Sequence, residues 1–214
     1  MVEAVNQEKI QRYRRLVQSL TDLGHSHAKA IRTKRHQLTY FYFVRCAGLV
    51  SGVVLLVENK QLSAAFALQK SVVDAVINGL YLGYAADDTE FNRLVAMTIK
   101  GKETGSIRKR ATKLDAALCK RKKFMSGQFA ELVKQTEEYV NEFAHGGVLS
   151  TSLDVVEHPP QVAYKVLADC TLLMMNFLGN VYILENIDLL PLKALMEEFH
   201  QSKSELNHPT AAFR

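Results

Sequence analysis

Apolar side chains recur at intervals of three and four residues through most of the 214-residue chain, the spacing that places them on one face of an α-helix. The sequence contains no proline before Pro159, and the glycines before it lie mostly where the apolar spacing breaks. A proline inside a helix removes a backbone donor and breaks the helix, so this arrangement permits a succession of helices. The pattern therefore predicts an all-α fold, a helical bundle of about seven to eight helices, and shows no alternation typical of β-strands.

Capping residues, glycines and prolines indicate where the expected helices begin and end. These helices run from about Ala4 to Leu23, Ser26 to Asn59, Leu62 to Ala86, Asp87 or Asp88 to Lys100, Thr104 or Ser106 to Lys123, Ser126 to His145, and Pro159 to Asn186, with a short one opened by Asp188 and Pro191. A chain of this length can bury a substantial core as one domain. We therefore expect a single helical-bundle domain over residues 1–205 and a frayed tail over residues 206–214.

Two apolar stretches are about as long as a membrane crossing: Leu38 to Val57 and Val166 to Leu184. The first contains Arg45, which would cost about 2.5 to 3.5 kcal/mol near the centre of a bilayer. The second contains Asp169 and two asparagines. We therefore expect two buried helices of a soluble bundle and no membrane partner, with membrane insertion as the minor alternative.

The composition is that of an ordinary globular protein, with 48% hydrophobic and 23% charged residues, and we find no secretory signal pattern. Its three cysteines are far apart in sequence, which does not suggest a disulfide framework and favours the cytoplasm. Two of the histidines, His25 and His27, would diverge by about 200° on a helix, so with His36 they make a poor metal cluster. No nucleotide-binding or hydrolase motif is present, and we expect no metal and no cofactor.

The segment Asn141-Glu-Phe-Ala-His145-Gly-Gly places an imidazole on the last turn of a predicted helix. Two glycines supply the left-handed conformation that favours a helix end. His145 and Asn141 fall on a face away from the apolar stripe of that helix, where the imidazole could act as a proton donor or an anion contact. The alternative is a histidine that only bonds the last carbonyls of its helix.

A polar stripe, Lys70, Asp74 and Asn78, recurs every four residues on a helix that is apolar on nearly every other side. Lysine before aspartate is the less favourable order for an isolated helical pair, so helix stability explains the stripe poorly. The stripe faces either an internal polar site or, in the alternative, solvent as an ordinary exposed edge.

The span Lys100 to Lys123 carries ten basic residues against Glu103 and Asp115, a local charge of +8. Such one-sided charge predicts contact with phosphates, and the first binding candidates are the consecutive cations Lys120, Arg121, Lys122 and Lys123. No aromatic residue is interleaved before Phe124, which favours contact with a nucleic-acid backbone over base stacking. The alternative is a merely solvated helix above an ordinary buried stripe.

Asp74-Ala-Val-Ile-Asn-Gly-Leu-Tyr-Leu82 and Asn141-Glu-Phe-Ala-His145-Gly-Gly together resemble an uncharacterised family of bacterial all-helical proteins. In that family an acidic residue precedes a Gly-Leu-aromatic-Leu segment, and an Asn-x-x-x-His-Gly-Gly segment follows later. More distantly the chain is similar to HEPN helical domains, which include dimeric ribonucleases, toxins and inactive binding modules. In those nucleases four to six residues separate an arginine from a histidine, whereas position 141 here is asparagine and only three residues separate Arg32 from His36.

The resemblance implies a HEPN-like homodimer that binds an anionic partner, with RNA as the first candidate. In its enzymatic form the protein would be a metal-independent ribonuclease, as a defence or toxin component, with His145, Asp74 and Asn141 as catalytic residues and Lys70 and Asn78 beside them. The alternative is a non-catalytic protein-interaction or dimerisation module. The sequence alone does not decide whether the protein is an enzyme.

Overall fold

The computed structural model describes residues 7–27, 33–100, 105–121, 127–144 and 160–207. These residues form eight α-helices and no β-strand, so the all-α prediction is confirmed. The helices are α1 (Gln7–Ser26), α2 (Lys34–Glu58), α3 (Leu62–Tyr84), α4 (Asp88–Ile99), α5 (Ile107–Lys120), α6 (Gln128–Ala144), α8 (Pro160–Glu185) and α9 (Leu190–Asn207).

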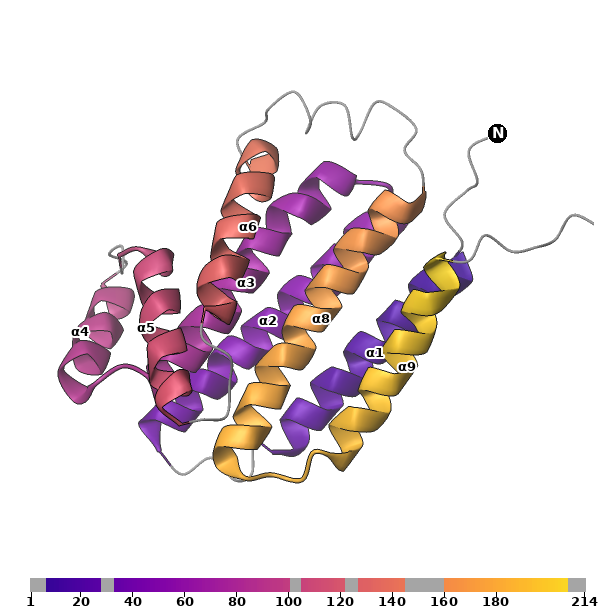
Figure 1. The fold of residues 1–214 in the computed structure, drawn as a ribbon. Coiled ribbons are helices and arrows are strands. Elements are labelled where there is room, and N and C mark those ends of the chain that lie inside the picture. The colour runs from indigo at the N-terminus through magenta and orange to yellow at the C-terminus, as the bar shows by residue number, and fades with distance from the viewer. Residues whose placement is uncertain (1–6, 28–32, 101–104, 122–126, 145–159, 208–214) are drawn as a thin grey trace, which may run out of the picture.

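The helix α3 occupies the middle of the bundle and packs against α2, α5, α6 and α8 (Figure 1). The pair α1 and α9 lies on one flank, whereas α4 and α5 lie on the opposite one. Buried aliphatic and aromatic side chains from α1, α2, α3 and α8 form most of the core. The polar residues Lys70, Asp74 and Asn78 of α3 are therefore half-buried between neighbouring helices.

The boundary between the first two helices differs from the prediction. Helix α1 does not end at Gly24 but continues to Ser26, and Gly24 is buried. A Cβ atom at Gly24 would lie 2.1 Å from Cε1 of Phe43, so the glycine allows two helices to approach each other and does not end one. Helix α2 begins at Lys34, later than expected, because the Thr33 hydroxyl accepts the backbone N–H of His36 at 3.2 Å and caps the helix there.

The capping predictions hold for α4 and α9, whereas Ser106 at the start of α5 makes no side-chain cap hydrogen bond. The carboxylate of Asp87 accepts the backbone N–H of Glu90 at 2.8 Å at the start of α4, and Asp188 accepts that of Leu190 at 3.0 Å before α9. Ser126, the predicted start of α6, lies outside the described residues, and the sequence gave no sign of the carboxylate that binds the first N–H groups of this helix. Buried Asp115, on α5, accepts the backbone N–H groups of Phe129 at 3.0 Å and Ala130 at 2.8 Å.

The two apolar helices differ in burial, which corrects the expectation that both would be core helices. Helix α8 is buried over most of its surface, whereas α2 exposes Phe41 (59%), Val44 (40%) and Leu55 (54%). By length and composition, α2 and α8 are the two helices in the described ranges that could cross a membrane.

Candidate functional site

Asp74 lies half-buried on α3, near charged residues of the same helix and of three other helices. Burial raises the pKa of its carboxyl group, and the nearby cations Lys70 on the same helix, Arg110 on α5 and Arg45 on α2 oppose that rise. Glu137 on α6 adds to the rise, because a second negative charge disfavours ionisation. Asp74 is therefore a desolvated carboxylate held between like and opposite charges.

The rest of the polar stripe shares this environment. Lys70 and Asn78 are half-buried like Asp74, so the stripe is not the fully solvated edge considered as an alternative. His145 lies outside the described residues, and Asn141 is described only as part of helix α6. Glu137, one turn before Asn141, is among the charges that act on Asp74. The part of α6 around Glu137 thus lies near the stripe, and the pairing of His145 with Asp74 stays a prediction.

The basic span divides into buried and exposed parts, which corrects the interpretation of the whole span as a surface charge. Arg110 is only 8% exposed and donates from Nη2 to the carbonyl of Gly105 at 3.2 Å. Burial lowers the pKa of Arg110, and Tyr42 and Asp74 act against that change. Arg110 therefore belongs to the interior beside Asp74 and is not available to an external phosphate.

The exposed cations of α5 form a stripe of their own. Lys109, Lys113 and Lys120 are exposed and, at 100° per residue, fall within about 40° of one another. The stripe extends along about 16 Å of helix. Arg121 follows at the helix end and is also exposed, whereas Lys122 and Lys123 lie outside the described residues.

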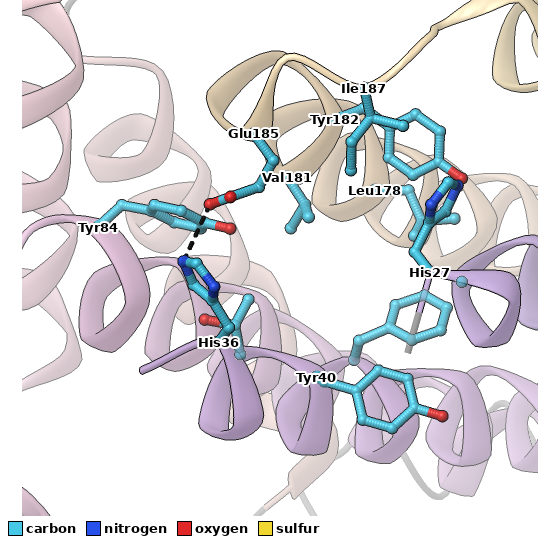
Figure 2. A pocket seen from close by; sticks show the side chains of 12 residues that line it. His27, His36, Tyr40, Tyr84, Leu178, Val181, Tyr182, Glu185 and Ile187 are labelled. Atoms are coloured by element: carbon cyan, nitrogen blue, oxygen red, sulfur yellow. Dashed lines mark ion pairs between the residues drawn. The ribbon is translucent and has the colours of Figure 1, made fainter. Parts of the chain in front are cut away.

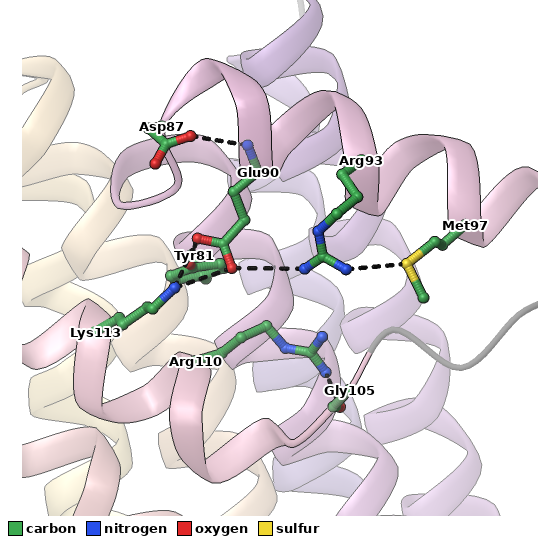
Figure 3. A network of polar contacts seen from close by, with 8 residues as sticks. All are labelled: Tyr81, Asp87, Glu90, Arg93, Met97, Gly105, Arg110 and Lys113. Atoms are coloured by element: carbon green, nitrogen blue, oxygen red, sulfur yellow. Dashed lines mark hydrogen bonds and ion pairs between the residues drawn. The ribbon is translucent and has the colours of Figure 1, made fainter.

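Figure 3 shows how Lys113 is anchored. Its Nζ donates to Oε2 of Glu90 at 2.8 Å, and the same carboxylate accepts a hydrogen bond from the Tyr81 hydroxyl. The hydrogen bond from Lys113 lowers the pKa of Glu90, and the one from Tyr81 contributes to the same effect. This network joins α3, α4 and α5 and partly neutralises Lys113, which leaves Lys109 and Lys120 as the stronger candidates for phosphate contact.

A second candidate site is a cavity of about 330 Å³ at the end of the bundle where α1, α3 and α8 terminate and α2 begins. We call it the end cavity. Its polar lining residues are His27, His36, Thr39, Tyr84 and Glu185, and its apolar lining includes Tyr40, Phe43, Leu178, Val181, Tyr182 and Ile187. The sequence singled out neither Glu185 nor Tyr84, and it gave His27 and His36 only as an unconvincing metal cluster.

Figure 2 shows two polar groups on opposite walls of the end cavity. On one wall Nε2 of His36 lies 3.2 Å from Oε1 of Glu185, and the Tyr84 hydroxyl donates to the same carboxylate. Burial raises the pKa of Tyr84, so its phenol stays protonated at neutral pH. On the other wall the ring of His27 meets that of Tyr182 edge-on, with 4.5 Å between centroids.

The arrangement is not that of a metal centre, since no group of three or more His, Cys, Asp or Glu residues could hold a metal ion within the part of the chain that the structure describes. Fold and sites together define an all-α bundle with a half-buried carboxylate beside a basic outer helix. Residues 46–203 match a family of unknown function, DUF6988, and the chain belongs to this family. The expectation of an uncharacterised family is thereby confirmed. No curated protein and no solved structure matches the chain.

Proposed function

We propose that this protein binds a phosphate-bearing partner, with RNA as the first candidate, through the exposed cations of α5. The observation that carries the proposal is the single exposed stripe of Lys109, Lys113 and Lys120, continued by Arg121. A linear row of cations matches a linear row of phosphates, and it holds the backbone without reading the bases.

The ion pairs of the region distinguish cations that already have a carboxylate partner from cations that can bind phosphate. Lys113 is bound to Glu90, and Arg108 is bound to Glu137 on α6. Lys109 and Lys120 form no ion pair with any residue that the structure describes. Their ammonium groups are therefore exposed to solvent and can pair with phosphates without first breaking an ion pair within the described residues.

In the catalytic form of the proposal, RNA is cleaved without a metal, with His145 as acid or base, Asp74 orienting it and Asn141 beside it. The half-buried Asp74 supports this form, because a carboxylate partly removed from water among several charges is typical of a functional site. Lys70 and Asn78 continue the stripe along the same helix. A role as a cytoplasmic defence or toxin component would follow from such an activity.

The test is the affinity for a fluorescently labelled single-stranded RNA of mixed sequence, measured by anisotropy at low salt. The variant with Lys109, Lys120 and Arg121 changed to glutamine should bind about tenfold more weakly or worse, because three phosphate contacts are lost. The control changes the exposed cations Arg15, Lys34 and Lys193 to glutamine and has the same net charge.

Equal affinities of the two triple variants would contradict the proposed surface, and no RNA affinity in the wild type would remove nucleic acid from the list of partners. The same samples, incubated with a metal chelator, also show whether the labelled RNA is cleaved without a metal. Cleavage that the change His145→Ala abolishes without altering the Tm would support the catalytic form.

A second candidate function, a homodimerisation or protein-interaction module, is favoured by the outer face of α2. Phe41, Val44, Gly48 and Leu55 lie on that face, at spacings of three, four and seven residues, and all four are exposed. Phe41 and Leu55 are equally distant from Gly48 along the helix. Two copies crossing antiparallel at Gly48 would therefore place Phe41 of each against Leu55 of the other, in an isologous contact.

A further inference from the structure

The end cavity combines aromatic walls with a single carboxylate, and the RNA proposal makes no use of it. We propose that it binds a small organic amine, whose cationic nitrogen lies against Glu185 and whose carbon body lies against the aromatic side chains. This inference does not rest on the proposed RNA binding, because the residues of the end cavity are distinct from the cation stripe of α5.

The walls favour a cation over an anion. Tyr40, Phe43 and Tyr182 line the cavity together with the ring of His27. The faces of aromatic rings carry partial negative charge and attract ammonium groups within about 6 Å. The Tyr182 phenol is itself neutral at physiological pH, since burial raises its pKa to about 12.

The helix C-termini around the end cavity also favour a cationic ligand. Helices α1, α3 and α8 all terminate there, and a helix C-terminus carries partial negative charge on its last carbonyls. Two arginines already donate hydrogen bonds to carbonyls at the end of α3. Arg35 donates to the carbonyls of Leu82 at 2.9 Å and Ala86 at 2.8 Å, and Arg121 donates to that of Tyr84 at 3.5 Å.

Glu185 has capacity for one more donor. Its carboxylate contacts His36 and Tyr84, whereas a carboxylate offers about four acceptor positions. The Glu185 side chain is 31% exposed, so an ammonium N–H can reach it without displacing either neighbour. His36 on the near wall and His27 on the far wall are the other titratable groups of the lining besides the tyrosines.

The volume limits the ligand. A cavity of about 330 Å³ lies at the small end of the range for ligand sites, which starts at about 300 Å³. It accommodates one ring with a short side chain and excludes a polymer. The chemical class is thus an aromatic or compact aliphatic primary amine.

Three probes of nearly equal shape test the charge preference: phenethylamine, 2-phenylethanol and phenylacetate, titrated by NMR against the full-length protein. Phenethylamine should bind about tenfold more tightly than the alcohol, as one ion pair of about 1.4 kcal/mol requires, and phenylacetate should bind most weakly. The change Glu185→Gln should remove the tenfold preference and leave the affinity for the alcohol unchanged. The control change Glu198→Gln, at an exposed position on α9, should leave all three affinities unaltered.

A second variant keeps the test decisive if Glu185→Gln perturbs the fold. Val181 is half-buried in the lining, and Val181→Phe should fill the cavity and abolish binding of both the amine and the alcohol. Equal affinity for amine and alcohol, tighter binding of phenylacetate, or no saturable binding of any probe to the wild type would each overturn the proposal.

Discussion

Asp74 is the residue in which stability and proposed function oppose each other most directly. Its side chain is one of the few polar groups on the central helix, and burial raises the pKa of the carboxyl group above its usual value despite three nearby cations. A folded-state pKa above the unfolded one means that the ionised form destabilises the fold. The protonated carboxyl group of Asp74 stabilises the fold. This contribution is fully present below the unfolded pKa and is lost as pH rises through the folded pKa.

We therefore predict that Asp74→Asn is at least as stable as the wild type at pH 7. The expected change is an increase of the Tm, by about 2 to 4 °C for each kcal/mol of ionisation cost that is removed. The difference between the two proteins should shrink as the pH falls from 7 towards 4, because the wild-type carboxyl then becomes protonated. Thermal unfolding followed by circular dichroism across this pH range measures the effect. A variant less stable than the wild type at pH 7 would show that the contacts with Lys70, Arg110 and Arg45 outweigh desolvation.

Helix α2 presents two different faces, a property that belongs to the element and not to any one residue. Val50, Val53 and Val57 point into the core, whereas Phe41 and Leu55 are on the outside. Such an exposed apolar face is a typical interaction surface. Gly48 lies in the middle of that outer face, and a Cβ placed there meets no atom within 4 Å. A larger side chain at this position therefore changes the surface and leaves the monomer intact.

For a symmetric contact at Gly48, we predict that the wild type is a dimer and that Gly48→Leu shifts it to the monomer. The same change should maintain or raise the free energy of unfolding of the monomer, by up to about 1 kcal/mol of helix propensity. Sedimentation velocity over a range of concentrations gives the oligomeric state. The matched control is Ala194→Leu, at an exposed position on α9. A wild type that stays monomeric, or a Gly48→Leu variant that stays dimeric, would argue against this interface.

At the level of elements, the apolar spacing predicted the helices well, because periodicity reports which face is buried. The apolar spacing of α6 predicted a stripe of Phe129, Leu132, Val133, Thr136, Val140 and Phe143. Phe129, Val133 and Thr136 are buried and Leu132 is half-buried, whereas the side chains of the other two lie outside the description. The same spacing could not distinguish a glycine that ends a helix from one that admits a neighbouring ring, as at Gly24. That distinction depends on Phe43, which belongs to another helix and has no signal near Gly24 in the sequence.

The sites were less predictable than the helices for a related reason. The stripe of Lys70, Asp74 and Asn78 could be found because its members share one helix and one spacing. The end cavity could not be found, because His36 and Glu185 come from opposite parts of the chain and meet only when α2 packs against α8. Arg110 was counted only as part of the basic span, although its spacing of three from Ile107 and four from Leu114 puts it on the buried side of α5.

At the scale of the whole molecule, the exposed cation stripe of α5 lies on one flank of the bundle. The chain has a formal net charge of +5, and its most basic span includes α5, the helix that lies on that flank beside α4 (Figure 1). A concentrated positive charge steers anionic polymers towards one side of a protein and makes their affinity depend on salt. The end cavity lies at the end of the bundle, so the two proposed ligands would not compete for the same residues.

The most direct measurement of the central proposal is the salt dependence of RNA binding. Each phosphate contact contributes about 0.7 to the slope of log affinity against log salt for a single strand. Changing Lys120, Arg121, Lys122 and Lys123 to glutamine should therefore lower the slope by up to about 2.8, with no change of preference between RNA sequences. A slope equal to that of the wild type would show that these cations do not contact the phosphates and would contradict the proposed function.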